Sequence, residues 1–110
     1  MTDGRVFNIH DQDGRLFCPA CGFAGYFSQP AYDEDGGIVG MGICPCCFWE
    51  PGYDDKASAD AKPTVLESLR AYRASWAETF AWRGKHHLRP AGWDGKTQLE
   101  ALLKRAPHVR

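Results

Sequence analysis

Hydrophobic positions in the second half of the chain recur at spacings of three and four residues. Between residues 66 and 81 they form one stripe, which consists of Leu66, Leu69, Tyr72, Trp76 and Phe80. A period close to 3.6 residues predicts an amphipathic helix. Arg70 and Arg73 fall outside the stripe, so we expect the aromatic face to pack on the rest of the protein and the arginines to face away from it.

Helix start and stop patterns flank this stripe. Thr64 and Glu67 have the spacing of a capping box and predict the start of the helix, and Gly84 predicts its end. A second capping pattern, Thr97 with Glu100, predicts a short second helix. The apolar residues of that second helix are Leu99, Leu102 and Leu103.

The first half of the chain has short apolar runs instead of a helical period. Runs within residues 1–15, at 15–17, at 23–27 and at 38–43 predict short strands, and the polar residues 28–37 predict a loop. The predicted fold is therefore a small α+β fold with an antiparallel β N-terminal half, a C-terminal amphipathic helix and a short second helix. We expect a single domain over residues 1–110, in which the helical part, 63–105, packs on the part formed by 1–55.

Four of the five cysteines form two Cys-x-x-Cys pairs with 22 residues between them. They are Cys18, Cys21, Cys44 and Cys47. Two cysteines three positions apart can bind the same ion when the backbone between them turns tightly, and two such pairs complete a tetrahedral zinc site. A proline after the first cysteine of each pair favours that turn. The spacing predicts one Zn²⁺ per chain in a zinc-ribbon-like N-terminal part.

The fifth cysteine and the residues after the pairs distinguish the two turns. Cys46 lies inside the second pair, so we expect it to be a small packed residue, with a reactive or redox-sensing thiol, or a Cys44-x-Cys46 ligand pair, as alternatives. Gly22 follows the first pair, where positive φ is common, but Phe48 follows the second. The second turn is therefore expected to be strained or built differently.

A disulfide framework is the competing interpretation of the cysteines. The chain opens without a signal-peptide pattern, which favours the reducing cytoplasm, and an odd number of cysteines suits disulfides poorly. No apolar run approaches the length of a membrane span, so no membrane association is expected. Metal binding is the preferred interpretation.

The cysteine segments resemble those of the bacterial cysteine-rich CPCC family. The matching stretches are Cys18-Pro-Ala-Cys-Gly-Phe23 and Ile43-Cys-Pro-Cys-Cys-Phe-Trp-Glu50, followed by Asp54 and Asp55. Ala20 departs from the family pattern, which often has a third cysteine there, and residues 51–53 are inserted before the acidic pair. The resemblance implies a small metal-binding domain and no established reaction.

Charge divides the chain into two halves of opposite sign. Residues 1–55 contain two basic and nine acidic residues, which gives −7, and residues 56–110 contain eleven basic and five acidic residues, which gives +6. This division favours packing of the two halves on each other or a head-to-tail dimer. The basic link Arg83–Arg89 is the best candidate for contact with nucleic acid.

Two large apolar residues follow the second cysteine pair. We expect Phe48 and Trp49 to cover the metal site, with an exposed Trp49 that anchors a partner as the alternative.

Three functions are consistent with these patterns. We favour a structural zinc site in a small protein-interaction module, because four thiolates leave no open position for catalysis and no catalytic constellation is visible. The partner is then an unidentified protein. The alternatives are a nucleic-acid-binding zinc ribbon and a thiol redox protein that acts through Cys46.

Overall fold

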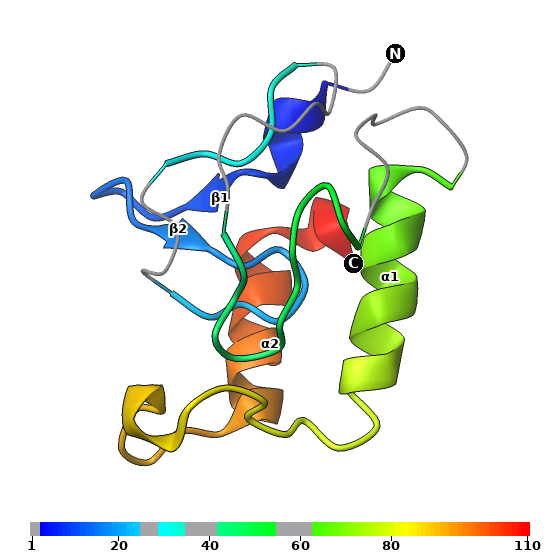
Figure 1. Ribbon diagram of the computed structural model, residues 1–110. Helices are drawn as coiled ribbons and strands as arrows, with labels where there is room; N and C mark the ends of the chain where they lie inside the picture. The colour runs from blue at the N-terminus through cyan, green and yellow to red at the C-terminus, as the bar shows by residue number, and fades with distance from the viewer. Residues whose placement is uncertain (1–2, 25–28, 35–41, 55–62) are drawn as a thin grey trace.

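The computed structural model of the protein describes residues 3–24, 29–34, 42–54 and 63–110, and it has a small α+β fold (Figure 1). Its elements in chain order are the 3₁₀ helix η1 (Gly4–Phe7), the strands β1 (Ile9–His10) and β2 (Leu16–Phe17), the helix α1 (Val65–Trp76), the 3₁₀ helix η2 (His86–Leu88), the helix α2 (Gly95–Arg105) and the 3₁₀ helix η3 (Pro107–Val109). None of the helices in these ranges is long and apolar enough to cross a membrane.

The sheet among the described residues is small. β1 and β2 pair antiparallel, with Ile9 opposite Phe17, and a single bridge joins Phe17 to Ala24. The predicted strand before the first turn is partly wrong, because residues 4–7 form η1, whose start is capped by the Asp3 side chain. The predicted strand at 15–17 corresponds to β2. Most of the predicted strands at 23–27 and 38–43 lie outside the described residues, as do residues 28 and 35–37 of the predicted loop, whereas residues 29–34 contain no helix or strand, in agreement with that prediction.

α1 starts where the sequence predicts and ends earlier. Thr64 and Glu67 form the capping box through bonds of 3.0 and 3.1 Å. The helix stops at Trp76 because the chain turns back on itself there: Phe80 takes a left-handed φ of 52° and packs its ring on Trp76 at 5.5 Å. The prediction that the helix continues to Gly84 was therefore wrong.

The buried face of α1 differs from the aromatic stripe. Val65, Leu69, Arg73 and Trp76 are buried, while Leu66 and Tyr72 are half-buried. The placement of Arg73 on the outer face was wrong. Its guanidinium is buried because it reaches backbone carbonyls of the cysteine-containing half, described below.

α2 begins earlier than predicted and has a different cap. Asp94 caps the helix by accepting a bond of 3.2 Å from the Thr97 backbone N–H, so Thr97 lies within the first turn instead of before it. Asp94 is as good a cap as threonine. Because Asp94 lies three positions before Thr97, the helix begins earlier and is longer than predicted. Leu99 and Leu102 face the core as expected.

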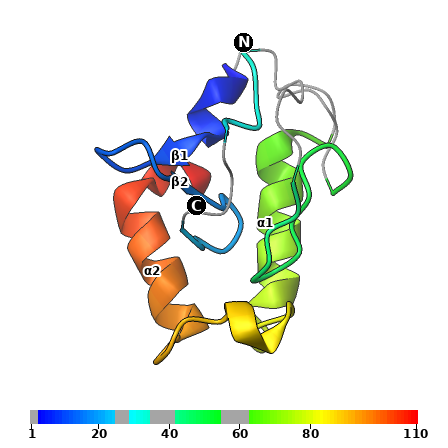
Figure 2. The ribbon, with the colours of Figure 1, turned by 60° about the vertical axis from the view of Figure 1, so that its left-hand side comes forward.

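One hydrophobic core contains residues from both halves of the chain. Figures 1 and 2 show α1 and α2 on either side of the loops that carry the cysteines. The buried cluster includes all five cysteines together with Trp49, Leu69, Trp76, Leu102 and Val109. The helical half therefore encloses the cysteine turns.

Candidate metal centre

The two cysteine turns have the same backbone hydrogen bonds. In the first turn, the Gly22 N–H donates to the Cys18 carbonyl at 2.8 Å, and the Cys18 N–H donates to the Phe23 carbonyl at 2.9 Å. In the second turn, the N–H of Phe48 and the carbonyl of Trp49 make the equivalent bonds to Cys44, again at 2.8 and 2.9 Å. The equal spacing of the two pairs thus produces two equivalent turns.

Both turns require a left-handed residue after their second cysteine. Gly22 has a φ of 91° and Phe48 a φ of 68°. Glycine adopts this conformation without penalty, whereas a residue with a Cβ pays about 1–2 kcal/mol. Of the two alternatives expected for the second turn, the structure has the strained one: the turn is built like the first, with Phe48 in the left-handed conformation.

The turns bring the four sulfur atoms together. Cys18 Sγ lies 3.8 Å from Cys47 Sγ, Cys21 Sγ lies 3.7 Å from Cys44 Sγ, and all four lie within 4.8 Å of one another. Four thiolates around zinc at about 2.3 Å are separated by about 3.8 Å along the edges of the tetrahedron. The four residues selected from the sequence therefore lie at distances compatible with a metal ion, and all five cysteines are free thiols, with none paired in a disulfide.

The site is shielded from solvent and holds negative charge poorly without a cation. Cys18, Cys21, Cys44 and Cys47 have no exposed surface. Burial raises the pKa of the Cys21 and Cys44 thiols, and the hydrogen bond with Cys18 raises the pKa of the Cys47 thiol. Burial alone would raise the pKa of Cys18 too, but the hydrogen bonds of the other three thiols lower it well below its usual range. Because burial disfavours the charged form of a thiol, a cation at the centre of the four sulfur atoms would favour their deprotonation.

A buried arginine ties the first turn to the helical half. Arg73 donates through Nε to the Ala20 carbonyl at 2.8 Å, through Nη2 to the Pro19 carbonyl at 2.6 Å and through Nη1 to the Val109 carbonyl at 2.7 Å. It forms no ion pair with a carboxylate among the described residues. Burial lowers the pKa of Arg73, and negative charge on the nearby cysteines opposes that shift. A metal bound by four thiolates would supply the missing negative charge.

The second turn is held by different groups. The Tyr72 hydroxyl donates to the Cys47 carbonyl at 2.6 Å, and the Arg83 N–H donates to the Cys46 carbonyl at 2.8 Å. Burial raises the pKa of Tyr72 to about 12, so its hydroxyl stays protonated and remains a donor. Gly84 passes so close to Pro45 that a Cβ at this position would collide with the Pro45 carbonyl.

Cys46 lies in the second turn at the place that Ala20 occupies in the first. It is fully buried, and Gln98 Nε2 lies 3.4 Å from its sulfur while also donating to the Cys21 carbonyl at 3.1 Å. The hydrogen bond with Cys21 lowers the pKa of Cys46. Cys46 lies outside the group of four and is packed, which agrees with the expected small core residue and gives a solvent-accessible thiol no support.

Trp49 covers the second turn from inside the protein. It has no exposed surface, its indole N–H donates to the Tyr32 hydroxyl at 3.3 Å, and its backbone N–H lies 3.4 Å from Cys47 Sγ. N–H to sulfur bonds of this kind stabilise thiolates. The alternative of an exposed Trp49 was wrong. Phe48, expected beside Trp49 as cover, is 46% exposed.

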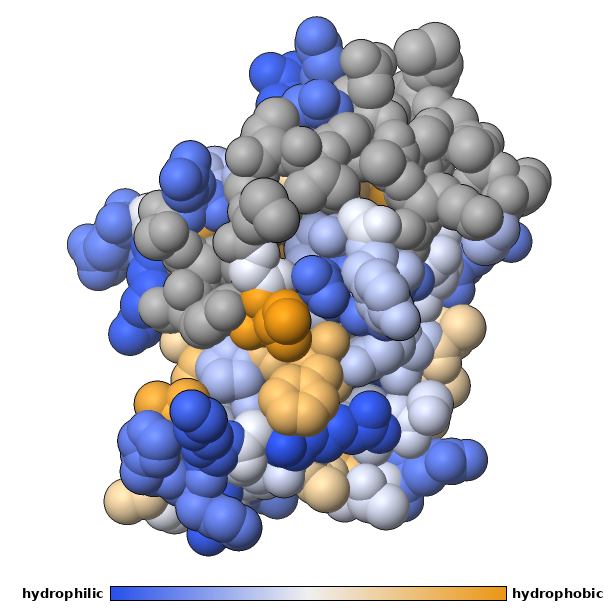
Figure 3. Space-filling view, in the orientation of Figure 1, coloured by the Kyte–Doolittle hydropathy of each residue, from blue (hydrophilic) through white to orange (hydrophobic). Residues whose placement is uncertain are grey.

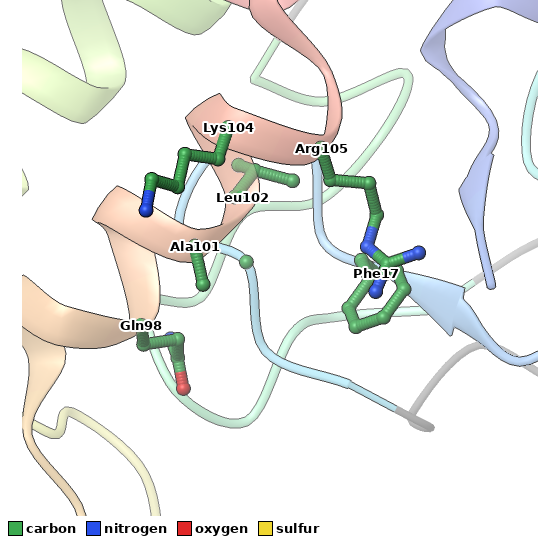
Figure 4. A pocket seen from close by; sticks show the side chains of 7 residues that line it. Phe17, Gln98, Ala101, Leu102, Lys104 and Arg105 are labelled. Carbon is green, nitrogen blue, oxygen red and sulfur yellow. The ribbon is translucent and has the colours of Figure 1, made fainter.

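A groove of about 480 Å³ lies beside the first turn, between β2 and α2 (Figure 4). Gly22 and Leu102 are among the residues that line it, and the Arg105 guanidinium lies 4.7 Å from the centre of the Phe17 ring. Figure 4 shows the Arg105 side chain reaching over that ring. Gly22 must be a glycine here for a second reason, because an added Cβ would lie 2.9 Å from the Gln98 carbonyl oxygen.

Sequence reasoning found the cysteines and missed the groups that surround them. The four predicted ligands lie together, whereas the basic link is an exposed segment whose Arg83 backbone contacts the second turn. Arg73, Tyr72 and Gln98 were not identified. Their positions depend on long-range packing, and no local pattern marks them.

Comparisons of the chain with protein-family models, with characterised proteins and with solved structures found no significant match.

Proposed function

We propose that the protein binds one zinc ion through Cys18, Cys21, Cys44 and Cys47, and that this ion has a structural role in a zinc-ribbon-like fold. One observation carries the proposal: four buried sulfur atoms lie within 4.8 Å of one another at the ends of two equivalent turns. A zinc ion would replace two weak thiol–thiol contacts by a cross-link between residues that are up to 29 positions apart.

The donor set favours structure over catalysis. Four thiolates satisfy the tetrahedral preference of zinc and leave no position for water or substrate. Their negative charge also weakens zinc as a Lewis acid. We therefore propose that the protein is not an enzyme. We also propose that it acts in the cytoplasm and is related to the CPCC family, which its cysteine segments resemble.

Interaction with another protein molecule is the activity that this arrangement supports best. Apolar side chains remain exposed next to the second turn, including Ile43, Phe48 and Tyr53. A protein that uses a metal to stabilise so small a core, and still exposes large apolar groups beside that metal, has the features of a binding module.

Native mass spectrometry with elemental analysis tests the metal proposal. We expect one zinc per chain in the unmodified protein and in Cys46→Ser, and loss of zinc in Cys18→Ser and Cys44→Ser. Cys46→Ser is the matched control because it alters a buried cysteine in the same turn. Retention of zinc in Cys47→Ser together with its loss in Cys46→Ser would assign the ligands to the Cys44-x-Cys46 alternative. Absence of metal from the unmodified protein would refute the proposal.

Nucleic-acid binding is the second candidate, and the exposure of the basic link is the observation that favours it. Lys85, His86, His87 and Arg89 are all exposed and lie close together on a short turn of helix. Binding of this kind would weaken steeply as salt increases. A salt titration of binding to short single- and double-stranded oligonucleotides separates it from the protein-interaction role.

A further inference from the structure

The second cysteine turn carries an exposed groove with apolar and acidic walls. Ile43, Phe48 and Tyr53 are 45%, 46% and 81% exposed, and they line a groove of about 390 Å³ together with Glu50, Asp54 and Tyr72. Figure 3 shows hydrophobic surface gathered over this turn, at the centre of one face of the molecule. We call this feature the acidic groove.

Phe48 is an unfavourable residue for the fold at this position. It has a φ of 68°, where the equivalent position of the first turn is Gly22, and nearly half of its side chain faces solvent. Glycine would remove both the backbone strain and the exposed ring. A strained backbone that holds an exposed aromatic side chain indicates a role in binding.

A second surface feature has the opposite charge. Leu88 is 47% exposed at the end of η2, and the residues around it in the basic link are exposed too: Lys85, His86, His87 and Arg89. This segment presents one apolar side chain surrounded by basic groups. The acidic groove presents an apolar cleft with two carboxylates, so the two features are complementary in charge, and each offers an apolar surface to the other.

The two features lie on the same face and are fixed relative to each other. Figure 3 shows a smaller hydrophobic spot, surrounded by hydrophilic surface, over η2 at the lower left of the face that carries the acidic groove. The link is attached to the second turn through the bond between the Arg83 N–H and the Cys46 carbonyl, and through the close contact of Gly84 with Pro45. One molecule therefore presents both features in a constant geometry.

We propose that two copies of the chain pair face to face about a two-fold axis, so that the basic link of each copy occupies the acidic groove of the other. This inference rests on the interaction role proposed above and names its partner as a second copy. A two-fold axis makes the link–groove contact twice and leaves neither feature of either copy unpaired. The two longer dimensions of the molecule, 40 and 30 Å, give a face large enough to bury the about 800 Å² per partner that stable pairs commonly need.

Charge reversal with complementation tests the pairing. The groove variant is Glu50→Arg, chosen because the Asp54 carboxylate accepts from the Glu50 N–H at 2.7 Å and is needed for the local turn. The link variant combines Lys85→Glu with Arg89→Glu. We expect the zinc-loaded parent to dimerise in sedimentation velocity over a concentration series. Each variant alone should dissociate at least tenfold more readily, and an equimolar mixture of the two variants should form a one-to-one heterodimer.

Two controls separate loss of the interface from loss of the fold. Asp13→Arg makes the same change of charge in the exposed turn between β1 and β2, and it should leave the dimer intact. Phe48→Gly should keep zinc and the fold while it weakens the dimer at least tenfold.

Several outcomes would overturn the inference. They are a zinc-loaded parent that stays monomeric up to millimolar concentration, a dimer that both variants leave unchanged, a mixture that does not pair, and assemblies longer than dimers, which would indicate head-to-tail contacts. A monomer with one zinc per chain would refute the pairing alone. A parent without metal would instead refute the metal proposal.

Discussion

Arg73 gives the sharpest test of how the helical half supports the cysteine turns. In Arg73→Leu, three buried carbonyls, those of Pro19, Ala20 and Val109, lose their donor. Each unsatisfied buried group costs about 1–3 kcal/mol, and water entering the vacated space offsets part of that cost. We therefore expect the free energy of unfolding to fall by about 3–5 kcal/mol. This is a large part of the total free energy of unfolding of a typical domain, which is about 5–15 kcal/mol.

Chemical denaturation at a fixed free zinc concentration measures this loss, since bound metal itself adds to stability. Competition with a chelator should show weaker zinc binding in the variant, because folding and metal binding are coupled. Arg70→Leu is the matched control. Arg70 lies on the same helix, is exposed and makes one hydrogen bond, to the Arg110 carbonyl at 2.7 Å, so its loss should change stability by no more than about 0.5 kcal/mol.

Arg73→Lys distinguishes charge from hydrogen bonding. A lysine keeps a positive charge near the thiolates, but its single ammonium group cannot reach carbonyls on two separate segments as the planar guanidinium does. We expect Arg73→Lys to recover less than half of the loss. Full recovery would show that charge alone matters, and a value for Arg73→Leu within about 1 kcal/mol of the parent would refute the hydrogen-bond account.

Three further predictions concern the turns and α2. Gly22→Ala should destabilise the protein by about 2–4 kcal/mol in denaturation experiments, because the left-handed backbone and the contact with α2 both exclude a Cβ; an unchanged midpoint would contradict this. Phe48→Gly should leave stability equal or raise it by up to about 1 kcal/mol, and a clear loss would show that the exposed ring supports the fold. A hydrogen bond from a threonine hydroxyl lowers the pKa of Asp94, so its stabilising effect is complete above the ordinary pKa of about 4 and is lost as pH falls through its lowered value. Thermal unfolding of Asp94→Asn should therefore vary less with pH below 4 than that of the parent.

Local patterns were sufficient for the parts of the molecule that depend on nearby residues. The cysteine pairs and the first capping box are set by spacing within a few positions, and the structure contains both; the stripe of α1 is buried only in part, at Leu69 and Trp76. Phe48 is instructive in the same way, because its place after the second pair indicated a turn that is either strained or built differently, and its φ of 68° is the strained form.

The remaining features depend on residues far apart in sequence. Arg73 looks like a surface residue on a helical projection, and its burial is explained by carbonyls 53 and 54 positions earlier and 36 positions later in the chain. The early end of α1 is likewise decided by packing, since Phe80 leaves the helix to lie against Trp76. Spacing predicts which groups a helix presents on one face, but it does not predict which acceptors a long side chain will meet.

The contact between Arg73 and Val109 also sets an order of events during synthesis. The four cysteines have all been synthesised once residue 47 is added. The hydrogen bonds that join the first turn to the helical half through Arg73 also need the Val109 carbonyl. A nascent chain therefore passes through a stage in which the thiols can capture an ion while the surrounding carbonyls still lack their donor. Metal bound at that stage would exchange more readily than metal in the folded protein, so addition of the segment that carries Val109 would convert a reversible capture into a lasting one.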